Sequence, residues 1–358
     1  KAIVSTRPYQ QDWPQLTSTE IPFLEACRGQ VPATTPIWIM RQAGRILQPY
    51  RKLRQHHGAI STLFNTPELA TEITLMPIEM LGVDAAILFT DLVTPLAALG
   101  CEYTYAPGPV FSSPTRTAAD IAALRPVVPE EDLGFVLETV RMVRRALPPS
   151  IPLIGYAGAP FTLATWIVEA GSSKDFPAFR GMIHKDPALA HQLLDKLSDL
   201  VADFLQAQIA AGVQAVQLFD TSVGLLSPSQ FSEFALPYLQ RICARIAPLN
   251  TPIIYFPLAA NHNFSHFKQV GADVLGLDWR IEIKQAQTQF DDIMPFQGNL
   301  DPCVLYGSEE SIINEAHRIL QQAKGHPHIF NLGHGVYPDT PYENVKLLVD
   351  TVHQFADK

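Results

Sequence analysis

Short apolar runs recur along the chain, and each is followed by a segment with helical periodicity. Runs that are apolar at nearly every position are typical of strands buried on both faces of a parallel sheet. We predict eight such strands, at Ile37–Met40, Ala85–Phe89, Pro152–Tyr156, Ala215–Phe219, Pro252–Phe256, Val274–Leu277, Ile293–Phe296 and Ile329–Leu332. Strands that alternate with helices indicate an α/β fold, and a count of eight favours a (β/α)₈ barrel of the TIM type.

The segments between the runs carry clear helix signals. Asp186 followed by Pro187 places a capping side chain before a proline at the first helical position, and leucines at helical spacing follow as far as Ile209. Further helices are predicted over 227–246, with a bend or break near Pro237, and over 308–324 and 340–355.

Length and composition fit one large folded unit. The chain has 358 residues, 47% of them hydrophobic, and shows neither a solenoid repeat nor a shift in composition that would mark a boundary. We therefore predict a single barrel domain over residues 1–358, with its active site at the carboxyl ends of the strands. The first residues after Lys1 lack the layout of a signal peptide, and no apolar run is long enough to span a membrane.

Charge and cysteine usage narrow the partners. A net charge of −9, from 26 basic and 35 acidic residues, argues against binding of nucleic acid or an anionic membrane. The four cysteines are scattered without CxxC spacing, which argues against a zinc cluster or a disulfide framework and favours a reducing compartment.

Polar or glycine-rich residues follow almost every predicted strand. They are Arg41 and Arg45, Asp91, Gly155–Pro160, Asp220–Ser222, Asp278–Trp279, Gln297–Asp301 and Asn331–Gly335. Each set alone is compatible with a turn or a helix cap. Because barrel enzymes build their active sites at the carboxyl ends of the strands, the whole series favours an enzyme.

Two arginines lie in the segment Met40–Arg45, directly after the first predicted strand. A guanidinium is always charged and offers five donors in a rigid fork, so a pair at a strand end suits an anionic ligand. The alternative is a pair of ordinary surface arginines on a loop.

Five segments resemble the uroporphyrinogen decarboxylase family, in the family's order and over nearly the whole chain. They are Pro36–Arg45 (PIWIMRQAGR), Phe89–Leu92 (FTDL), Gly155–Thr165 (GYAGAPFTLAT), Gln297–Pro302 (QGNLDP) and Asn331–Gly335 (NLGHG). The resemblance implies a (β/α)₈ barrel, a homodimer, and removal of CO₂ from the four acetate arms of uroporphyrinogen III to give coproporphyrinogen III. It also implies that the reaction uses no cofactor and no metal.

The resemblance assigns roles to individual residues. It implies that Asp91, Arg41 and Arg45 are catalytic, with Asp91 stabilising a protonated pyrrole ring and the arginines facing substrate carboxylates. The implied substrate-binding residues are Arg54, Trp166, Thr221 and His334. The alternatives are a turn for Asp91, a solvated helix face for Arg54, a helix cap for Thr221 and a hydrogen bond in the core for His334.

Several positions depart from the family pattern. Trp166 and Ser222 stand where relatives usually carry Tyr and Trp or His, Leu258–Asn261 replaces a glycine-rich loop, Ile46 replaces Tyr, and Gln48-Pro49 replaces Pro-Glu. Two alternatives therefore stay open: a methyltransferase of the same superfamily, or a porphyrinogen-binding protein with reduced activity. For the methyltransferase, His262 and His266 are candidate zinc ligands, although no cysteine accompanies them. We expect a cytoplasmic protein, or one of the plastid stroma if the source is a plant.

Overall fold

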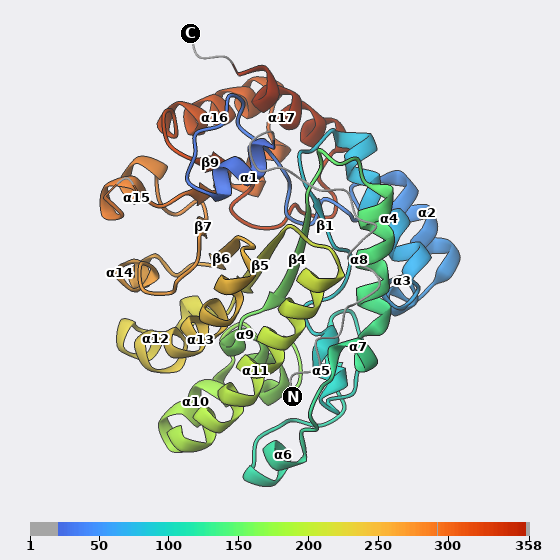
Figure 1. The fold of residues 1–358 in the computed structure, drawn as a ribbon, viewed down its shortest axis with the longest axis vertical. Helices are drawn as coiled ribbons and strands as arrows, with labels where there is room; N and C mark the ends of the chain where they lie inside the picture. The colour runs from blue at the N-terminus through green and yellow to red at the C-terminus, as the bar shows by residue number, and fades with distance from the viewer. Residues whose placement is uncertain (1–20, 292, 356–358) are drawn as a thin grey trace.

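A curled parallel sheet lies at the centre of the computed structural model, which describes residues 21–291 and 293–355, and helices cover its outside (Figure 1). Within these residues the sheet comprises, in spatial order, β1 (Ala86–Ile87), β4 (Leu153–Gly158), β5 (Ala215–Asp220), β6 (Ile253–Pro257), β7 (Val274–Gly276), β8 (Phe296–Gln297) and β9 (His328–Ile329). Every adjacent pair is parallel, and the spatial order follows the chain order. The predicted α/β class is confirmed. The prediction that the first residues lack the layout of a signal peptide concerns residues outside the described range.

Two of the predicted strands differ most from the structure, and the last strand, β9, lies at His328–Ile329 instead of Ile329–Leu332. Of the run Ile37–Met40, only Ile37 pairs with the sheet, in an isolated parallel bridge to Phe330. The run beginning at Ile293 is wrong at its start, because Ile293 lies in the connection after the helix Ile283–Gln289 and is 78% exposed. The strand begins at Phe296, directly after a proline.

Residues 36–38 nevertheless lie beside the last strand. The Trp38 amide donates to the Phe330 carbonyl (3.3 Å), and the Phe330 amide donates to the Pro36 carbonyl (2.8 Å). On the other side, the Asp84 amide donates to the Ile37 carbonyl (2.8 Å). The segment therefore runs between β9 and the residues that lead into β1.

Buried polar side chains inside the sheet show how strongly it curls. The Trp38 indole donates to the Gln297 amide oxygen (2.9 Å), and Gln297 Nε2 donates to Gln217 Oε1 (2.8 Å). Gln217 lies on β5 and Gln297 on β8, with two strands between them. Side chains on such strands meet only if the sheet bends around them.

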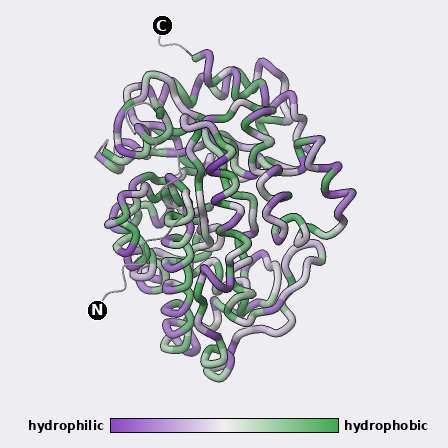
Figure 2. Tube along the Cα trace, turned by 45° about the vertical axis from the view of Figure 1, so that its right-hand side comes forward, coloured by the Kyte–Doolittle hydropathy of each residue, from purple (hydrophilic) through white to green (hydrophobic). Residues whose placement is uncertain are grey.

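The outer layer consists of helices, most of which pack one face on the sheet or on each other. They are α1 (Pro22–Cys27), α2 (Gln48–His57), α3 (Ile60–Asn65), α4 (Pro67–Leu81), α5 (Thr94–Ala98), α6 (Ala118–Ala123), α7 (Pro129–Asp132), α8 (Gly134–Ala146), α9 (Pro160–Glu169), α10 (Pro177–Lys185), α11 (Pro187–Ala211), α12 (Pro228–Phe234), α13 (Leu236–Ile246), α14 (Phe264–Phe267), α15 (Ile283–Gln289), α16 (Glu309–Gln322) and α17 (Tyr342–Gln354). Short 3₁₀ turns lie at η1 (Val223–Leu225), η2 (Ala247–Leu249), η3 (Asn261–Asn263) and η4 (Pro302–Tyr306). Hydrophobic and hydrophilic residues alternate along many of the helices in Figure 2, as expected of helices with one buried face.

The predicted helix signals are confirmed. The Asp186 carboxylate accepts from the Leu189 amide (3.1 Å) and caps α11. The stretch 227–246 breaks at Ala235, between α12 and α13, because Pro237 at the start of α13 cannot continue the preceding hydrogen-bond ladder. None of the helices among the described residues has the length and apolar composition needed to cross a bilayer.

A small hairpin outside the main sheet was not predicted. It consists of β2 (Tyr103–Tyr105) and β3 (Pro109–Phe111), paired antiparallel. The Phe111 amide donates to the carbonyl of Ala170, the residue that ends α9 (2.9 Å). The hairpin is therefore attached to the helix that follows β4.

Candidate active site

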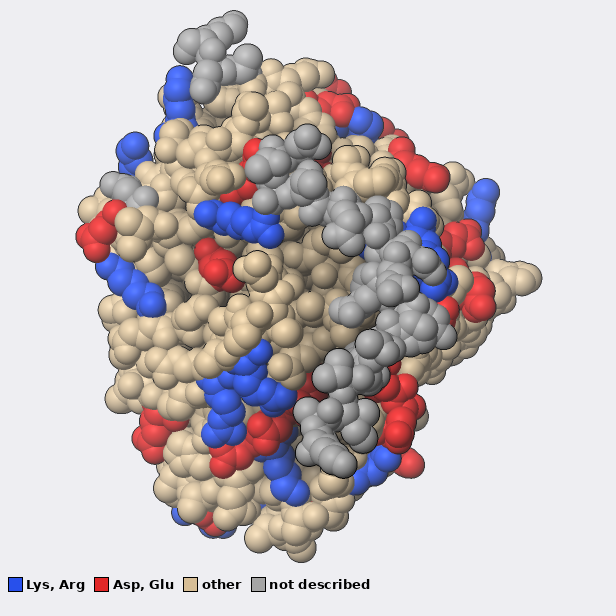
Figure 3. All heavy atoms as spheres, in the orientation of Figure 1, with Lys and Arg blue, Asp and Glu red and all other residues tan. Residues whose placement is uncertain are grey.

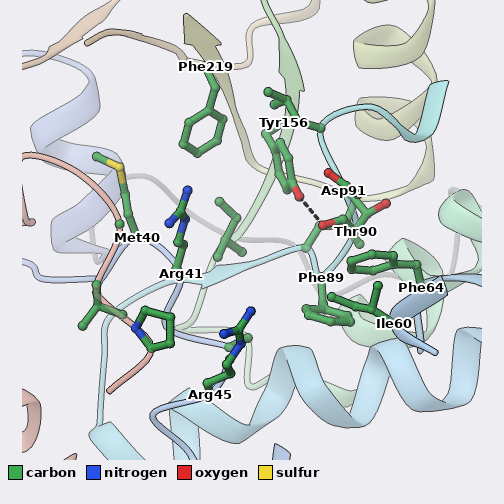
Figure 4. Close-up of a pocket in the computed structure, with 18 of the residues that line it drawn as sticks. Met40, Arg41, Arg45, Ile60, Phe64, Phe89, Thr90, Asp91, Tyr156 and Phe219 are labelled. Carbon is green, nitrogen blue, oxygen red and sulfur yellow. Dashed lines mark hydrogen bonds between the residues drawn. The ribbon is translucent and has the colours of Figure 1, made fainter. Parts of the chain in front are cut away.

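The turn after residues 36–40 is held by a buried glutamine. Gln42 Oε1 accepts from the Ile39 amide (3.0 Å), and Gln42 Nε2 donates to the Ala85 carbonyl (3.1 Å), so this side chain joins the turn to the residue before β1. Arg41 adopts a left-handed conformation, with φ of 66°. The arginines on either side of Gln42 extend into a pocket (Figure 4).

The NLGHG segment is attached to the same turn. Asn331 Oδ1 accepts from the Met40 amide (3.0 Å), and the Val336 amide donates to the Met40 carbonyl (2.9 Å). A Cβ atom built on Gly335 would lie 2.3 Å from Arg41 Cδ. The glycine is thus required for the path that the Arg41 side chain takes past this loop.

These turns enclose a cavity of about 470 Å³, within the usual range for a small-molecule site. All of the predicted site residues except Arg54 line it. Those that do are Arg41, Arg45, Asp91, Trp166, Thr221 and His334. In Figure 4, Arg41 and Arg45 extend from one side of the pocket, and Asp91 lies on the other.

Arg54 lies elsewhere. It is on α2, one turn after Tyr50, and Tyr50 does line the cavity. Burial raises the pKa of the Tyr50 phenol, and the positive charge of Arg54 opposes this rise. A direct contact between Arg54 and a ligand in this cavity remains a prediction.

Asp91 follows β1 and is partly buried. Burial raises the pKa of its carboxyl group, while hydrogen bonds from the Tyr105 hydroxyl and from the amides of Val93 and Leu92 oppose that rise. The positive charge of Arg41 opposes it further. Burial therefore raises the pKa of the Asp91 carboxyl overall, and these donors and the charge of Arg41 limit that rise.

The two arginines supply the positive charge of the pocket. The Arg41 side chain is exposed within the pocket. Protein atoms nevertheless surround its guanidinium on several sides, and the resulting desolvation lowers its pKa. Arg45 is exposed. On the face shown in Figure 3, acidic and basic side chains are interspersed.

His334 is a neutral group in this environment. Burial first, and then the charges of Arg41 and Arg280, lower its pKa to about 4. Its ring stacks on Phe256, with centroids 6.2 Å apart and an interplanar angle of 24°. A neutral imidazole can donate and accept one hydrogen bond each.

Aromatic side chains that we did not predict form much of the wall: Phe64, Phe89, Tyr156 and Phe219. The Tyr156 hydroxyl donates to the Thr90 carbonyl (2.6 Å), next to Asp91, and the Tyr156 ring meets Phe219 edge to face at 5.2 Å. A tyrosine in an otherwise apolar run, directly before a glycine-rich strand end, was the available signal at position 156. The pocket thus combines a flat apolar wall with charge at two places.

The positions that depart from the family pattern separate into two groups. Trp166 and Ile46 line the cavity. Ser222 does not, because it is buried behind the wall, where its hydroxyl accepts from Thr165 Oγ1 (3.1 Å). The loop Leu258–Asn261 is also absent from the lining.

Among the described residues, no group of three or more His, Cys, Asp and Glu side chains is placed to hold a metal ion. Of the two candidate zinc ligands, His262 contacts the Leu226 carbonyl through Nε2 (2.7 Å), and His266 stacks on Phe231. Both imidazoles therefore take part in local packing.

Two comparisons of the sequence with known proteins agree on one family. The family model described as uroporphyrinogen decarboxylase (URO-D) matches residues 18–355. The chain is 45% identical to "Uroporphyrinogen decarboxylase" of Citrifermentans bemidjiense, over 94% of this chain and 99% of that protein. It is also 45% identical to the protein of the same name from Syntrophotalea carbinolica, over 93% and 97%.

A similar solved structure is a methyltransferase from Methanosarcina mazei, with a TM-score of 0.79 and 22% identity over 94% of this chain and 98% of that one. At this level of identity the likeness concerns the fold alone.

Proposed function

The chain belongs to the uroporphyrinogen decarboxylase family, and we propose here how its pocket carries out the reaction. The protein is an enzyme that decarboxylates uroporphyrinogen in tetrapyrrole biosynthesis. The observation that carries the proposal is the placement of a desolvated carboxylate, Asp91, across one cavity from two arginines.

Loss of CO₂ from an acetate arm needs an acceptor for the electron pair of the breaking bond. Protonation of the adjacent pyrrole carbon makes the ring cationic, and the electron pair then moves into that ring. A second proton converts the resulting exocyclic methylene into a methyl group, and the first proton leaves the ring. The Asp91 carboxylate accepts hydrogen bonds from pyrrole N–H groups and stabilises the cationic ring in a largely apolar cavity.

The remaining residues bind and orient the substrate. Arg41 and Arg45 hold carboxylate arms through charged hydrogen bonds. His334 and Thr221 offer neutral hydrogen-bonding groups, and Trp166 contributes a flat apolar surface to the wall. We retain Arg54 as a basic group that approaches the substrate from α2. None of these steps requires a cofactor or a metal ion.

The test is anaerobic incubation with uroporphyrinogen III, with products separated by the number of carboxyl groups. We expect hepta- to tetracarboxylate products from the wild-type protein. Asp91→Asn keeps the shape of the side chain but removes its charge, so we expect a loss of rate of about 10²-fold or more. Circular dichroism should show unchanged folding of the variant.

Two results would oppose this mechanism. Near-wild-type turnover by Asp91→Asn would mean that the aspartate is structural. Tight binding of uroporphyrinogen by the wild-type protein without any product would favour the alternative of a porphyrinogen-binding protein. The likeness to a methyltransferase is one of fold and adds no support for methyl transfer.

We also propose that residues 36–39 act as an eighth strand, which closes the sheet into a (β/α)₈ barrel within a single domain over 1–358. The hydrogen bonds of Pro36 and Trp38 to Phe330, and of Asp84 to Ile37, support this closure. So does the apolar core, which is continuous from Ile21 to Val352.

A homodimer and a cytoplasmic location complete the proposal. The family resemblance supports the dimer, and light scattering after gel filtration tests it. The four cysteines are unpaired, as in proteins of a reducing compartment. Fractionation of the source cells tests the location.

A further inference from the structure

Tyr105 reaches Asp91 from outside the sheet. Its hydroxyl donates a hydrogen bond to Asp91 Oδ2. Tyr105 lies at the end of β2, in the hairpin, and is not itself part of the cavity lining. A hairpin that is separate from the main sheet therefore contributes a hydrogen-bond donor to the carboxylate at the centre of the proposed site.

The surroundings of Tyr105 fix the position of this donor. Its ring meets that of Tyr103 edge to face at 5.6 Å, and it meets Phe64 of α3 at 6.3 Å. The hairpin itself is anchored where the Phe111 amide donates to the carbonyl of Ala170 at the end of α9. The hydroxyl is thus held by contacts from three parts of the chain, so little side-chain freedom is lost when it binds the carboxylate.

The contact counteracts the cost of placing Asp91 in an apolar cavity. Burial favours the protonated acid, and a hydrogen bond from Tyr105 favours the carboxylate. Burial and the charge of Asp91 both raise the pKa of the Tyr105 phenol, so Tyr105 stays protonated and remains a donor.

We propose that Tyr105 is a positioning residue for the decarboxylation, which keeps the Asp91 carboxylate ionised and turned toward the ligand. The inference rests on the role proposed for Asp91. Tyr105 acts through that carboxylate and does not itself contact the reacting ring.

Three other titratable or charged groups interact electrostatically with Asp91. They are Arg41 from the turn after residue 40, Tyr103 from the same hairpin, and Tyr156 from β4. Arg41 favours the carboxylate, whereas the two phenols remain protonated because burial and Asp91 raise their pKa values. A pH effect that is specific to Tyr105 must therefore be separated from an effect of the hairpin as a whole.

The test compares Tyr105→Phe with Tyr103→Phe. Both variants remove one hydroxyl from β2 and keep the aromatic ring, but only Tyr105 donates to Asp91. The readout is kcat/KM for uroporphyrinogen III as a function of pH, which reports ionisation of the free enzyme.

We expect Tyr105→Phe to move the acid limb upward by roughly one pH unit, because a hydrogen bond to a charged group is lost. Tyr103→Phe should move it much less. An unchanged acid limb in Tyr105→Phe, or equal shifts in the two variants, would overturn the proposal.

A second measurement does not depend on turnover. The C=O stretch of a protonated carboxyl group, followed by infrared difference spectroscopy and assigned with Asp91→Asn, should titrate at higher pH in Tyr105→Phe than in the wild-type protein. Identical titrations would overturn the proposal. If Asp91→Asn retains full activity, the proposed mechanism fails; if it is inactive and Tyr105→Phe behaves as wild type, only the role of Tyr105 fails.

Discussion

At the scale of single residues, Gly335 determines where Arg41 can lie. A Cβ at this position would be 2.3 Å from Arg41 Cδ and 2.6 Å from Arg41 Nε, so Gly335→Ala must displace the arginine side chain. The displaced atoms belong to a flexible side chain, and we expect stability to change by less than about 1 kcal/mol. We expect kcat/KM for uroporphyrinogen to fall about tenfold or more, because a charged contact to the substrate is misplaced.

The matched control is Gly181→Ala. Gly181 lies within α10, and a Cβ there would meet nothing within 4 Å. Steady-state kinetics and thermal unfolding of both variants separate the two effects. Loss of stability in Gly335→Ala without a kinetic defect would show that the glycine serves folding and not the position of Arg41.

The charge state of His334 gives a second prediction. Because burial and two neighbouring arginines lower its pKa to about 4, the imidazole should stay neutral throughout the neutral range. In NMR spectra, its ring C–H signals, assigned by comparison with His334→Gln, should therefore not shift between pH 8 and about pH 5. Titration near pH 6.5 would mean that the imidazole is solvated and carries charge during substrate binding.

The sequence contained enough information to find several residues of the site, but not the residues that hold those side chains in place. Arg41 and His334 stand in specific motifs at strand ends, and the parallel topology brings those ends together. Tyr105 lies in a strand of three residues, which is too short to show periodicity. Its hydrogen bond to Asp91 joins residues that are 14 positions apart, and no local sequence pattern predicts that they meet. The cavity wall likewise depends on which aromatic side chains point inward, and this became visible only in the folded sheet.

At the scale of elements, Asp220 joins three of them. It is the last residue of β5, is fully buried, and accepts hydrogen bonds from Thr162 of α9 (2.6 Å) and Tyr255 of β6 (2.6 Å). Burial raises its pKa from 3.8 to about 6, and the two hydroxyl donors only partly oppose that rise. The folded protein therefore holds a proton between these pH values that the unfolded chain has released.

The stability of this junction should depend on pH with a defined sign. Since the folded state binds the extra proton, the contribution of Asp220 to the free energy of unfolding falls as pH rises from about 4 to about 6, by about 3 kcal/mol in total. Asp220→Asn cannot titrate. The free energy of unfolding of wild type minus that of the variant, from urea denaturation, should therefore be about 2 kcal/mol lower at pH 7 than at pH 4, because the unfolded carboxyl group is already partly ionised at pH 4. A difference that is independent of pH would show that Asp220 is ionised over the whole interval.

Prediction of elements succeeded where the pattern was long and failed where it was short. The helix beginning at Pro187 carries a cap, a proline and many turns of apolar spacing, and it was found with its start correct. The strands near Ile37 and Ile293 are brief, so a few apolar residues in a row did not distinguish a paired strand from a neighbouring loop. Pairing there is decided by contacts with distant strands.

At the scale of the whole molecule, Trp38 links the beginning of the chain to the far side of the sheet. Its indole donates to Gln297 of β8, and Gln297 donates in turn to Gln217 of β5. These groups are fully buried. The polar contacts inside the sheet therefore connect segments that are distant in sequence, and they explain why residues 36–40 stay in place although only one of them forms a bridge.

Removal of the indole should destabilise the entire fold. Trp38→Phe leaves Gln297 Oε1 buried without its donor and removes volume from the core, so we expect the free energy of unfolding to fall by about 2–4 kcal/mol in urea denaturation. Trp279→Phe is the control, since that indole is only partly buried and lies under the Arg280 guanidinium at 4.3 Å. Because Met40 and Arg41 directly follow Trp38, the loosened turn should also weaken substrate binding and raise KM. Equal losses of stability in the two variants would show that the closure of the sheet does not depend on the buried contacts of Trp38.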